Sequence, residues 1–302
     1  MTVAQKPLGT IQVDVDDLWV YYESIGAQTP SAAPAAAFTE GIPRLLDLFD
    51  KYGVRATFFV CGRDLPAQAR CVATIIRRGH EVANHSAEHR NGYARLDRGD
   101  LRADVRIAHE RIADAAGKAP VGFKAPGFSY NDALPEVLIE LGYVYDSSRL
   151  PTFYAPAIRL AQSALSGGLV DPTHYGRFAY GFAPLWPHRL NGTDLLEAPV
   201  TTIPLLRAPM HSTFVLSAGQ WLFDLGFGMV RARRAPVNYL LHAGDVLDRV
   251  DDPVLRSYRF LTRTWEAKRP LYEHLLAALT AGYRIVPTAE FVAAWDAAEL
   301  KV

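Results

Sequence analysis

Two histidines lie four positions apart in the segment His85-Ser86-Ala87-Glu88-His89. In one turn of helix this spacing places both imidazoles on one side, within reach of a single metal ion. Adjacent carboxylates, Asp16 and Asp17, follow an apolar segment near the start of the chain. Two carboxylates at a buried strand end are costly unless a cation compensates them. We therefore expect a metal site, with Asp17 completing a set of three ligands that leaves positions open for water and substrate.

Short apolar segments precede these polar residues and predict the elements that position them. Strands are expected at 11–15, 56–60, 80–84, 121–124, 143–145, 238–242 and 283–286, and helices at 41–52, 67–78, 102–116, 135–141 and 270–281, followed by a C-terminal helix. Alternation of strand and helix indicates a parallel sheet covered by helices. The carboxyl ends of such strands are where ligands and catalytic groups collect.

Two segments depart from this alternation. Residues 151–209 are dense in proline and glycine and show weak periodicity, so we expect loops and irregular strands there. Residues 23–38, with several alanines and prolines, predict a mobile loop beside the first strand, and a tolerated insertion is favoured over a lid.

Composition excludes several classes of protein. The 302 residues are 49% hydrophobic and 21% charged, which excludes disorder, collagen and coiled coil. The 32 basic and 32 acidic side chains cancel, so no electrostatic footprint for nucleic acid is present. Two cysteines, Cys61 and Cys71, cannot form a disulfide framework and favour a reducing compartment. The first residues lack an apolar signal region, so we expect a cytoplasmic protein.

One apolar stretch leaves two interpretations open. Residues 203–230 are rich in leucine, phenylalanine and tryptophan and are followed by Arg231, Arg233 and Arg234. The stretch either rests on anionic lipid at the inner membrane face or forms a barrel helix with an ordinary apolar face. Oligomeric state is not indicated.

The order of the motifs resembles the polysaccharide deacetylases of the NodB-homology type, carbohydrate esterase family four. Asp14-Val15-Asp16-Asp17 corresponds to the family's Thr-Phe-Asp-Asp motif, and the segment from His85 to His89 matches its His-Ser/Thr-x-x-His motif in full. Lys124-Ala125-Pro126 stands for Arg-x-Pro, and Leu240-Leu241-His242 for Leu-x-His. The resemblance implies an α/β fold, a distorted (β/α) barrel, in a single catalytic domain over 1–302 with an irregular insertion around 151–237.

The resemblance also implies roles at the metal. Asp17, His85 and His89 would hold one divalent ion, with zinc favoured over cobalt, nickel or manganese. Asp16 would be the general base that deprotonates the attacking water. Lys124 replaces the family's arginine, which orients the base, and offers a point charge rather than a planar fork. We expect Lys124 to pair with Asp16.

The remaining implied roles concern the acyl group and the leaving amine. The oxyanion would rest on the metal and on the backbone N–H of Gly127. His242 would protonate the leaving amine, and Leu240 would shape a pocket for a small acyl group. The family's fourth motif is degenerate, with Asp146 its nearest match, and we expect Asp146 to orient His242.

These roles imply a hydrolase that removes an acetyl or formyl group from an amino sugar. The Asp-Val-Asp start also resembles the undecaprenyl-phosphate aminosugar deformylases and deacetylases, which suggests a lipid-linked substrate. Three alternatives stay open: a zinc peptidase that uses Glu88 in the pattern H-x-x-E-H, a non-catalytic sugar-binding module, and a cyclic-amide hydrolase similar to metal-independent allantoinases. Outside these motifs, His80, His109 and His274 are assigned structural roles.

Overall fold

The computed structural model describes residues 6–31, 33, 35–166, 171–190 and 192–299. The first five residues, on which part of the expectation about a signal segment depends, lie outside this set. Among the described helices, none has the length and apolar character needed to cross a membrane.

A curled sheet forms the centre of the molecule, with strand order β6-β7-β5-β4-β3-β2-β1-β8 and with β9 beside β1. All neighbours pair in parallel except β6 and β7. The strands are β1 (Leu8–Val15), β2 (Thr57–Val60), β3 (Glu81–Asn84), β4 (Gly122–Phe123), β5 (Tyr145–Asp146), β6 (His188–Arg189), β7 (Leu196–Glu197), β8 (Val237–His242) and β9 (Arg284–Ile285). Beyond β7, the Thr201 N–H donates to the Asn238 carbonyl at the start of β8 over 3.0 Å, so the two ends of the sheet approach each other. The prediction of a distorted barrel is confirmed.

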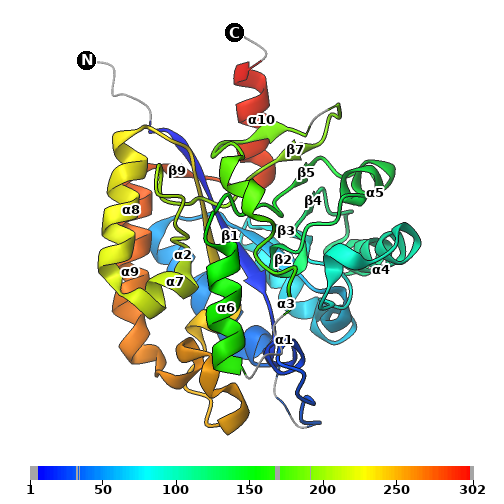
Figure 1. The fold of residues 1–302 in the computed structure, drawn as a ribbon, viewed down its shortest axis with the longest axis vertical. Helices are drawn as coiled ribbons and strands as arrows, with labels where there is room; N and C mark the ends of the chain where they lie inside the picture. The colour runs from blue at the N-terminus through cyan, green and yellow to red at the C-terminus, as the bar shows by residue number, and fades with distance from the viewer. Residues whose placement is uncertain (1–5, 32, 34, 167–170, 191, 300–302) are drawn as a thin grey trace.

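Helices surround the sheet (Figure 1). They are α1 (Leu18–Ser24), α2 (Ile42–Tyr52), α3 (Leu65–Arg77), α4 (Arg98–Ala116), α5 (Leu134–Glu140), α6 (Ala155–Ser166), α7 (Ser212–Ala218), α8 (Gln220–Ala232), α9 (Trp265–Gly282) and α10 (Thr288–Glu299). In α2, Ile42, Leu45 and Phe49 recur at helical spacing and are buried, and the helix ends at Gly53 with φ of 64°. The predicted strands and helices of the first half of the chain are therefore present, with ends that differ by a few residues.

The prediction for residues 151–209 was only partly right. Short strands β6 and β7 lie there, as irregular strands were expected, but α6 occupies Ala155–Ser166. Pro156 lies in the first turn of α6, where a missing N–H costs nothing, so the proline that suggested a loop begins a helix. Of the expected loop 23–38, residues 23–24 end α1 and residues 37–38 begin a π-helical turn at Ala37–Gly41, while residues 32 and 34 lie outside the described part of the chain.

The apolar stretch that ends near Arg231 forms α7 and α8. Phe223, Phe227 and Val230 of α8 are buried in the main core, whereas Trp221 is 61% exposed. This one-sided burial is that of an amphipathic helix on a barrel, and it favours the second of the two interpretations given above.

Candidate active site

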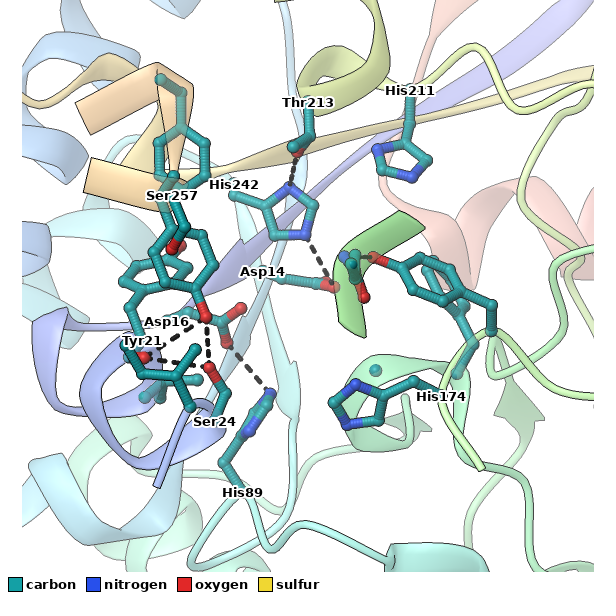
Figure 2. Close-up of a pocket in the computed structure, with 18 of the residues that line it drawn as sticks. Asp14, Asp16, Tyr21, Ser24, His89, His174, His211, Thr213, His242 and Ser257 are labelled. Atoms are coloured by element: carbon teal, nitrogen blue, oxygen red, sulfur yellow. Dashed lines mark hydrogen bonds and ion pairs between the residues drawn. The ribbon is translucent and has the colours of Figure 1, made fainter. Parts of the chain in front are cut away.

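A cavity of about 190 Å³ lies at the carboxyl ends of the central strands. Asp14 and Asp16 reach it from the end of β1, His85 and His89 from the segment after β3, and His242 from the end of β8. Figure 2 shows Asp14, Asp16, His89 and His242 facing a common space. The sheet thus brings together residues that are more than 200 positions apart in the sequence.

The histidine pair lies on a tight turn rather than on a helix. Asn84 Oδ1 accepts from the Ser86 N–H over 2.7 Å, and Ser86 Oγ accepts from the His89 N–H over 3.0 Å. Both Ser86 (φ 70°) and His89 (φ 42°) adopt left-handed backbone conformations. The predicted helical turn was wrong, because side-chain hydrogen bonds stabilise this turn instead. The two imidazoles nevertheless converge, with ring centroids 5.2 Å apart.

Asp16 completes a group of three possible metal ligands with His85 and His89. Its Oδ1 lies 3.4 Å from His85 Nε2 and 3.5 Å from His89 Nε2, and the candidate ligand atoms all lie within 4.8 Å of one another. Asp16 Oδ1 is buried and has no hydrogen-bond partner within the described part of the chain. His85 Nδ1 contacts the Lys124 carbonyl at 2.8 Å, which directs Nε2 towards Asp16. An orphaned carboxylate oxygen facing two imidazole nitrogens fits a divalent cation.

The electrostatics of Asp16 agree with this arrangement. Burial raises the pKa of Asp16, but the neighbouring imidazoles of His89 and His85 outweigh burial and hold it well below its usual range. Burial lowers the pKa of His89 to about 4, so this imidazole is neutral near pH 7. An ionised carboxylate beside a neutral imidazole is the state in which both bind metal ions.

Asp17, predicted as the third ligand, has a different role. Its Oδ1 accepts from the N–H groups of Leu18 (2.8 Å) and Ala37 (3.1 Å), so that it caps α1 and anchors the turn that precedes α2. Side chains alternate along an extended chain, so Asp14 and Asp16 share one face and Asp17 does not. The structure therefore assigns Asp16 in place of Asp17 to the ligand group, and the expectation is corrected.

Lys124 pairs with Asp14, not with Asp16 as expected. Lys124 Nζ donates to Asp14 Oδ1 over 2.8 Å, and both side chains are almost fully buried. Burial lowers the pKa of Lys124, and the carboxylate of Asp14 offsets part of that effect. Asp14 Oδ2 lies 3.9 Å from both His85 Nε2 and His242 Nε2. This oxygen therefore lies between the candidate metal ligands and the histidine of β8.

His242 takes its acidic partner from its own loop. Its Nδ1 lies 3.5 Å from Asp245 Oδ2 and 3.2 Å from Thr213 Oγ1, and its backbone N–H donates to Asp245 Oδ2 over 3.1 Å. Burial lowers the pKa of His242, but the hydrogen bond and charge of Asp245 outweigh it and raise the pKa to about 9. His242 is therefore protonated at neutral pH.

Asp146 does not orient His242 as expected. Asp146 Oδ2 has no hydrogen-bond partner within the described part of the chain. Asp146 Oδ1 accepts a hydrogen bond from Ser148 Oγ, and its register partner is Glu197. Burial raises the pKa of Asp146 to about 6.

The two residues expected to contact the acyl group differ in position. Gly127 lines the cavity and has φ of 54°, a left-handed conformation that suits glycine. Leu240 is fully buried and packs behind Phe128, which itself lines the cavity. Leu240 itself is not among the residues that line the cavity.

Glu88, the base of the peptidase alternative, faces away from the histidine pair. Its carboxylate lies 4.0 Å from Arg63 Nη1, both side chains are about 40% exposed, and Glu88 is not among the residues that line the cavity. His80 accepts from the Ala56 N–H, His109 contacts the Tyr143 hydroxyl and His274 pairs with Asp224. These contacts agree with structural roles for the three histidines.

Sequence reasoning missed several residues that line the cavity or contact its lining. Asp245 has a local signal, because it lies three positions after His242 and the two form a capping box. Two further histidines that line the cavity have no local signal: His174 lies within the weakly periodic segment 151–209 and His211 just after it. Figure 2 shows both on the side of the cavity opposite Tyr21 and Ser24.

Comparison with known proteins gives matches that include part of this site. The family model for polysaccharide deacetylase matches residues 27–145, a range that includes His85, His89 and Lys124. A peptidoglycan deacetylase of Helicobacter pylori is 32% identical over 158 residues, which are 51% of this chain and 53% of that protein. The chain spans about half the length of the curated relatives it matches.

Solved structures share the fold over nearly the whole chain. A protein of Mycobacterium smegmatis described as a polysaccharide deacetylase aligns with a TM-score of 0.65 at 20% identity, covering 99% of this chain and 93% of that one. An allantoinase aligns with a TM-score of 0.61 at 12% identity, covering 98% and 92%. At these identities the likeness concerns the fold alone. Residues 27–145 of the chain thus match the polysaccharide deacetylase family model, and the chain as a whole shares the fold of these solved structures.

Proposed function

We propose that the protein is a metal-dependent amidohydrolase that removes an acetyl or formyl group from an amino sugar. The observation that carries the proposal is the convergence of three groups in one cavity. These groups are the ligand set of Asp16, His85 and His89, the carboxylate of Asp14 paired with Lys124, and the imidazole of His242 paired with Asp245. They correspond to the cation, the base and the acid that amide hydrolysis needs.

Asp16, His85 and His89 would hold the cation. A bound divalent ion would polarise the acyl carbonyl and lower the pKa of a water molecule. Two imidazoles and one carboxylate suit zinc, and also cobalt, nickel or manganese. We keep zinc as the first candidate.

Asp14 is the general base in this proposal, in place of Asp16. Asp16 faces both imidazoles, whereas Asp14 Oδ2 lies equally far from His85 and His242. Lys124 Nζ holds Asp14 Oδ1 by a hydrogen bond of 2.8 Å, so that Asp14 Oδ2, which faces His85 and His242, can accept the proton of the attacking water. The water oxygen bonds to the acyl carbon, and its proton passes to Asp14.

His242 is the general acid. Asp245 keeps its imidazole protonated at neutral pH, so it can donate a proton to the amide nitrogen as the carbon–nitrogen bond breaks. The products are a carboxylate and a free amine. The backbone of Gly127 borders the same space and is a candidate donor to the oxyanion.

The cavity favours a small substrate group. Its volume of about 190 Å³ lies below the roughly 300–1,000 Å³ of pockets that bind drug-sized ligands. Phe128, Tyr175, Tyr258 and Phe260 are among the residues that line it. These features support a reaction on one sugar residue at a time. A sugar on a lipid carrier is one form of such a substrate.

The test is metal analysis of the purified protein beside an assay for acetate and formate release. The substrate panel contains N-acetylated and N-formylated amino sugars, free and at the end of short oligosaccharides. We expect acylate release that a chelator abolishes and that added zinc restores. Full activity after chelation, on a cyclic amide but not on the sugars, would favour the allantoinase-like alternative. Bound sugar without any acylate release would favour the binding module.

A further inference from the structure

His211 is a buried residue that lines the cavity and has no role in the proposed mechanism. Its side chain is 4% exposed, and neither ring nitrogen has a hydrogen-bond partner within the described part of the chain. The ring packs against Phe214 with centroids 4.8 Å apart, and lies 5.7 Å from the ring of His242. It lines the cavity and is directed towards the space that His242 and Asp14 face (Figure 2).

Packing alone does not account for a histidine at this position. Leaving a buried polar group unpaired costs about 1–3 kcal/mol, a cost that phenylalanine would avoid while filling similar space. His80, a structural histidine of the same chain, has a partner for its Nδ1 in the Ala56 N–H at 3.0 Å. An unpaired imidazole that lines a cavity therefore indicates that a bound molecule completes its hydrogen bonds.

A second unpaired polar group lies across the cavity. The hydroxyl of Tyr21 is buried and has no hydrogen-bond partner among the described residues. The Tyr21 ring is fixed by Tyr258 and Phe260, at centroid distances of 5.1 and 5.3 Å. Tyr21 and His211 also lie on opposite sides of the cavity in Figure 2.

The hydrogen-bonding capacity of the imidazole indicates which chemical group of a substrate can bind it. Burial lowers the pKa of His211 to about 3, so the ring is neutral at pH 7 and offers one donor and one acceptor. A carboxylate only accepts and an ammonium only donates, so even two groups of either kind would leave one ring nitrogen unpaired, whereas two neighbouring sugar hydroxyls can pair with both. A hydroxyl both donates and accepts, as does the hydroxyl of Tyr21.

We propose that His211, with Tyr21 across the cavity, forms a hydroxyl-recognition subsite that selects a sugar ring over other N-acylated amines. This inference rests on the proposed function and names the feature of the substrate that the site recognises. His211 is a binding residue in this account, since proton transfer is assigned to Asp14 and His242.

The test compares the parent enzyme with His211→Phe on N-acetylglucosamine and its 3-, 4- and 6-deoxy analogues. We expect the parent to lose about tenfold to hundredfold in kcat/KM on one of the deoxy sugars, and His211→Phe to lose a similar factor on the complete sugar. On that deoxy sugar the variant and the parent should then be nearly equal. His211→Asn, which keeps a donor and an acceptor, should recover part of the loss.

The control is His109→Phe, the same substitution outside the cavity, which should leave the selectivity unchanged. Equal hydrolysis of all the deoxy sugars by the parent would overturn the inference even if His211→Phe fails to fold. So would an unchanged selectivity in a folded His211→Phe. A parent that releases no acylate from any sugar would instead overturn the proposed function itself.

Discussion

Asp14 and Lys124 form a buried ion pair, with Lys124 Nζ 2.8 Å from Asp14 Oδ1. The pair joins the end of β1 to the segment after β4, and the ammonium also lies 4.5 Å from the centroid of the Phe59 ring. Taking two charges out of water is costly, and their attraction offsets that cost only while both are present. Both the stability of the barrel and the position of the proposed base Asp14 therefore depend on this pair.

The first prediction concerns this pair. Lys124→Met leaves Asp14 buried and unpaired, so we expect the free energy of unfolding to fall by about 3–5 kcal/mol and acylate release to be lost. Urea unfolding and the release assay measure the two effects. The double variant Asp14→Asn with Lys124→Met removes both charges and should regain stability without regaining activity. A Lys124→Met variant as stable and active as the parent would refute the coupling.

The second prediction is a pH dependence. His242 must be protonated to act as an acid, so activity falls as the pH rises through its pKa, which Asp245 raises to about 9. Asp245→Asn removes that charge, so the pKa of His242 falls and the alkaline limb of kcat/KM moves to lower pH. Asp146→Asn is the matched control and should leave the limb in place. If only the Asp146 variant shifts the limb, the partner of His242 has been assigned wrongly.

Much of the fold followed from local pattern, whereas only part of the site did. Strand and helix periodicity predicted the elements around Asp16 and His85 because each element buries one face. The ligand set depends on the alternation of side chains beyond β1, which turns Asp17 towards α1, whereas the motif alone assigns the ligand role to Asp17. Asp245 could have been found from the sequence, because its spacing from His242 is that of a capping box. No sequence pattern pointed to His211, since only the tertiary fold brings it beside His242.

The third prediction concerns Gly127. A Cβ at this position would lie 2.7 Å from His174 Cδ2, and φ is 54°, so Gly127→Ala forces the imidazole to move and strains the backbone. We expect a loss of about 1–2 kcal/mol in stability from the left-handed conformation, together with a lower kcat/KM. Adding His174→Ala should relieve the clash but not the backbone strain. Thermal unfolding of the single and double variants separates the two effects, and a Gly127→Ala variant equal to the parent in both assays would contradict the argument.

The fourth prediction tests the peptidase alternative. Glu88 faces Arg63 at the surface, so Glu88→Gln should change acylate release by no more than about twofold, as expected for a surface substitution. Asp14→Asn should reduce it at least about a hundredfold, as expected for loss of a general base. Cleavage of casein by the parent that disappears in Glu88→Gln would support a peptidase instead.

The central claim is that Asp16, rather than Asp17, binds the cation with His85 and His89. The most direct test is the zinc content, per chain, of Asp16→Ala and Asp17→Ala after removal and readdition of the metal. We predict that Asp17→Ala loses about 0.5–2 kcal/mol of stability as a helix-cap variant but binds zinc like the parent. Asp16→Ala should retain its fold and lose the zinc. Zinc retained by Asp16→Ala and lost by Asp17→Ala would contradict the account.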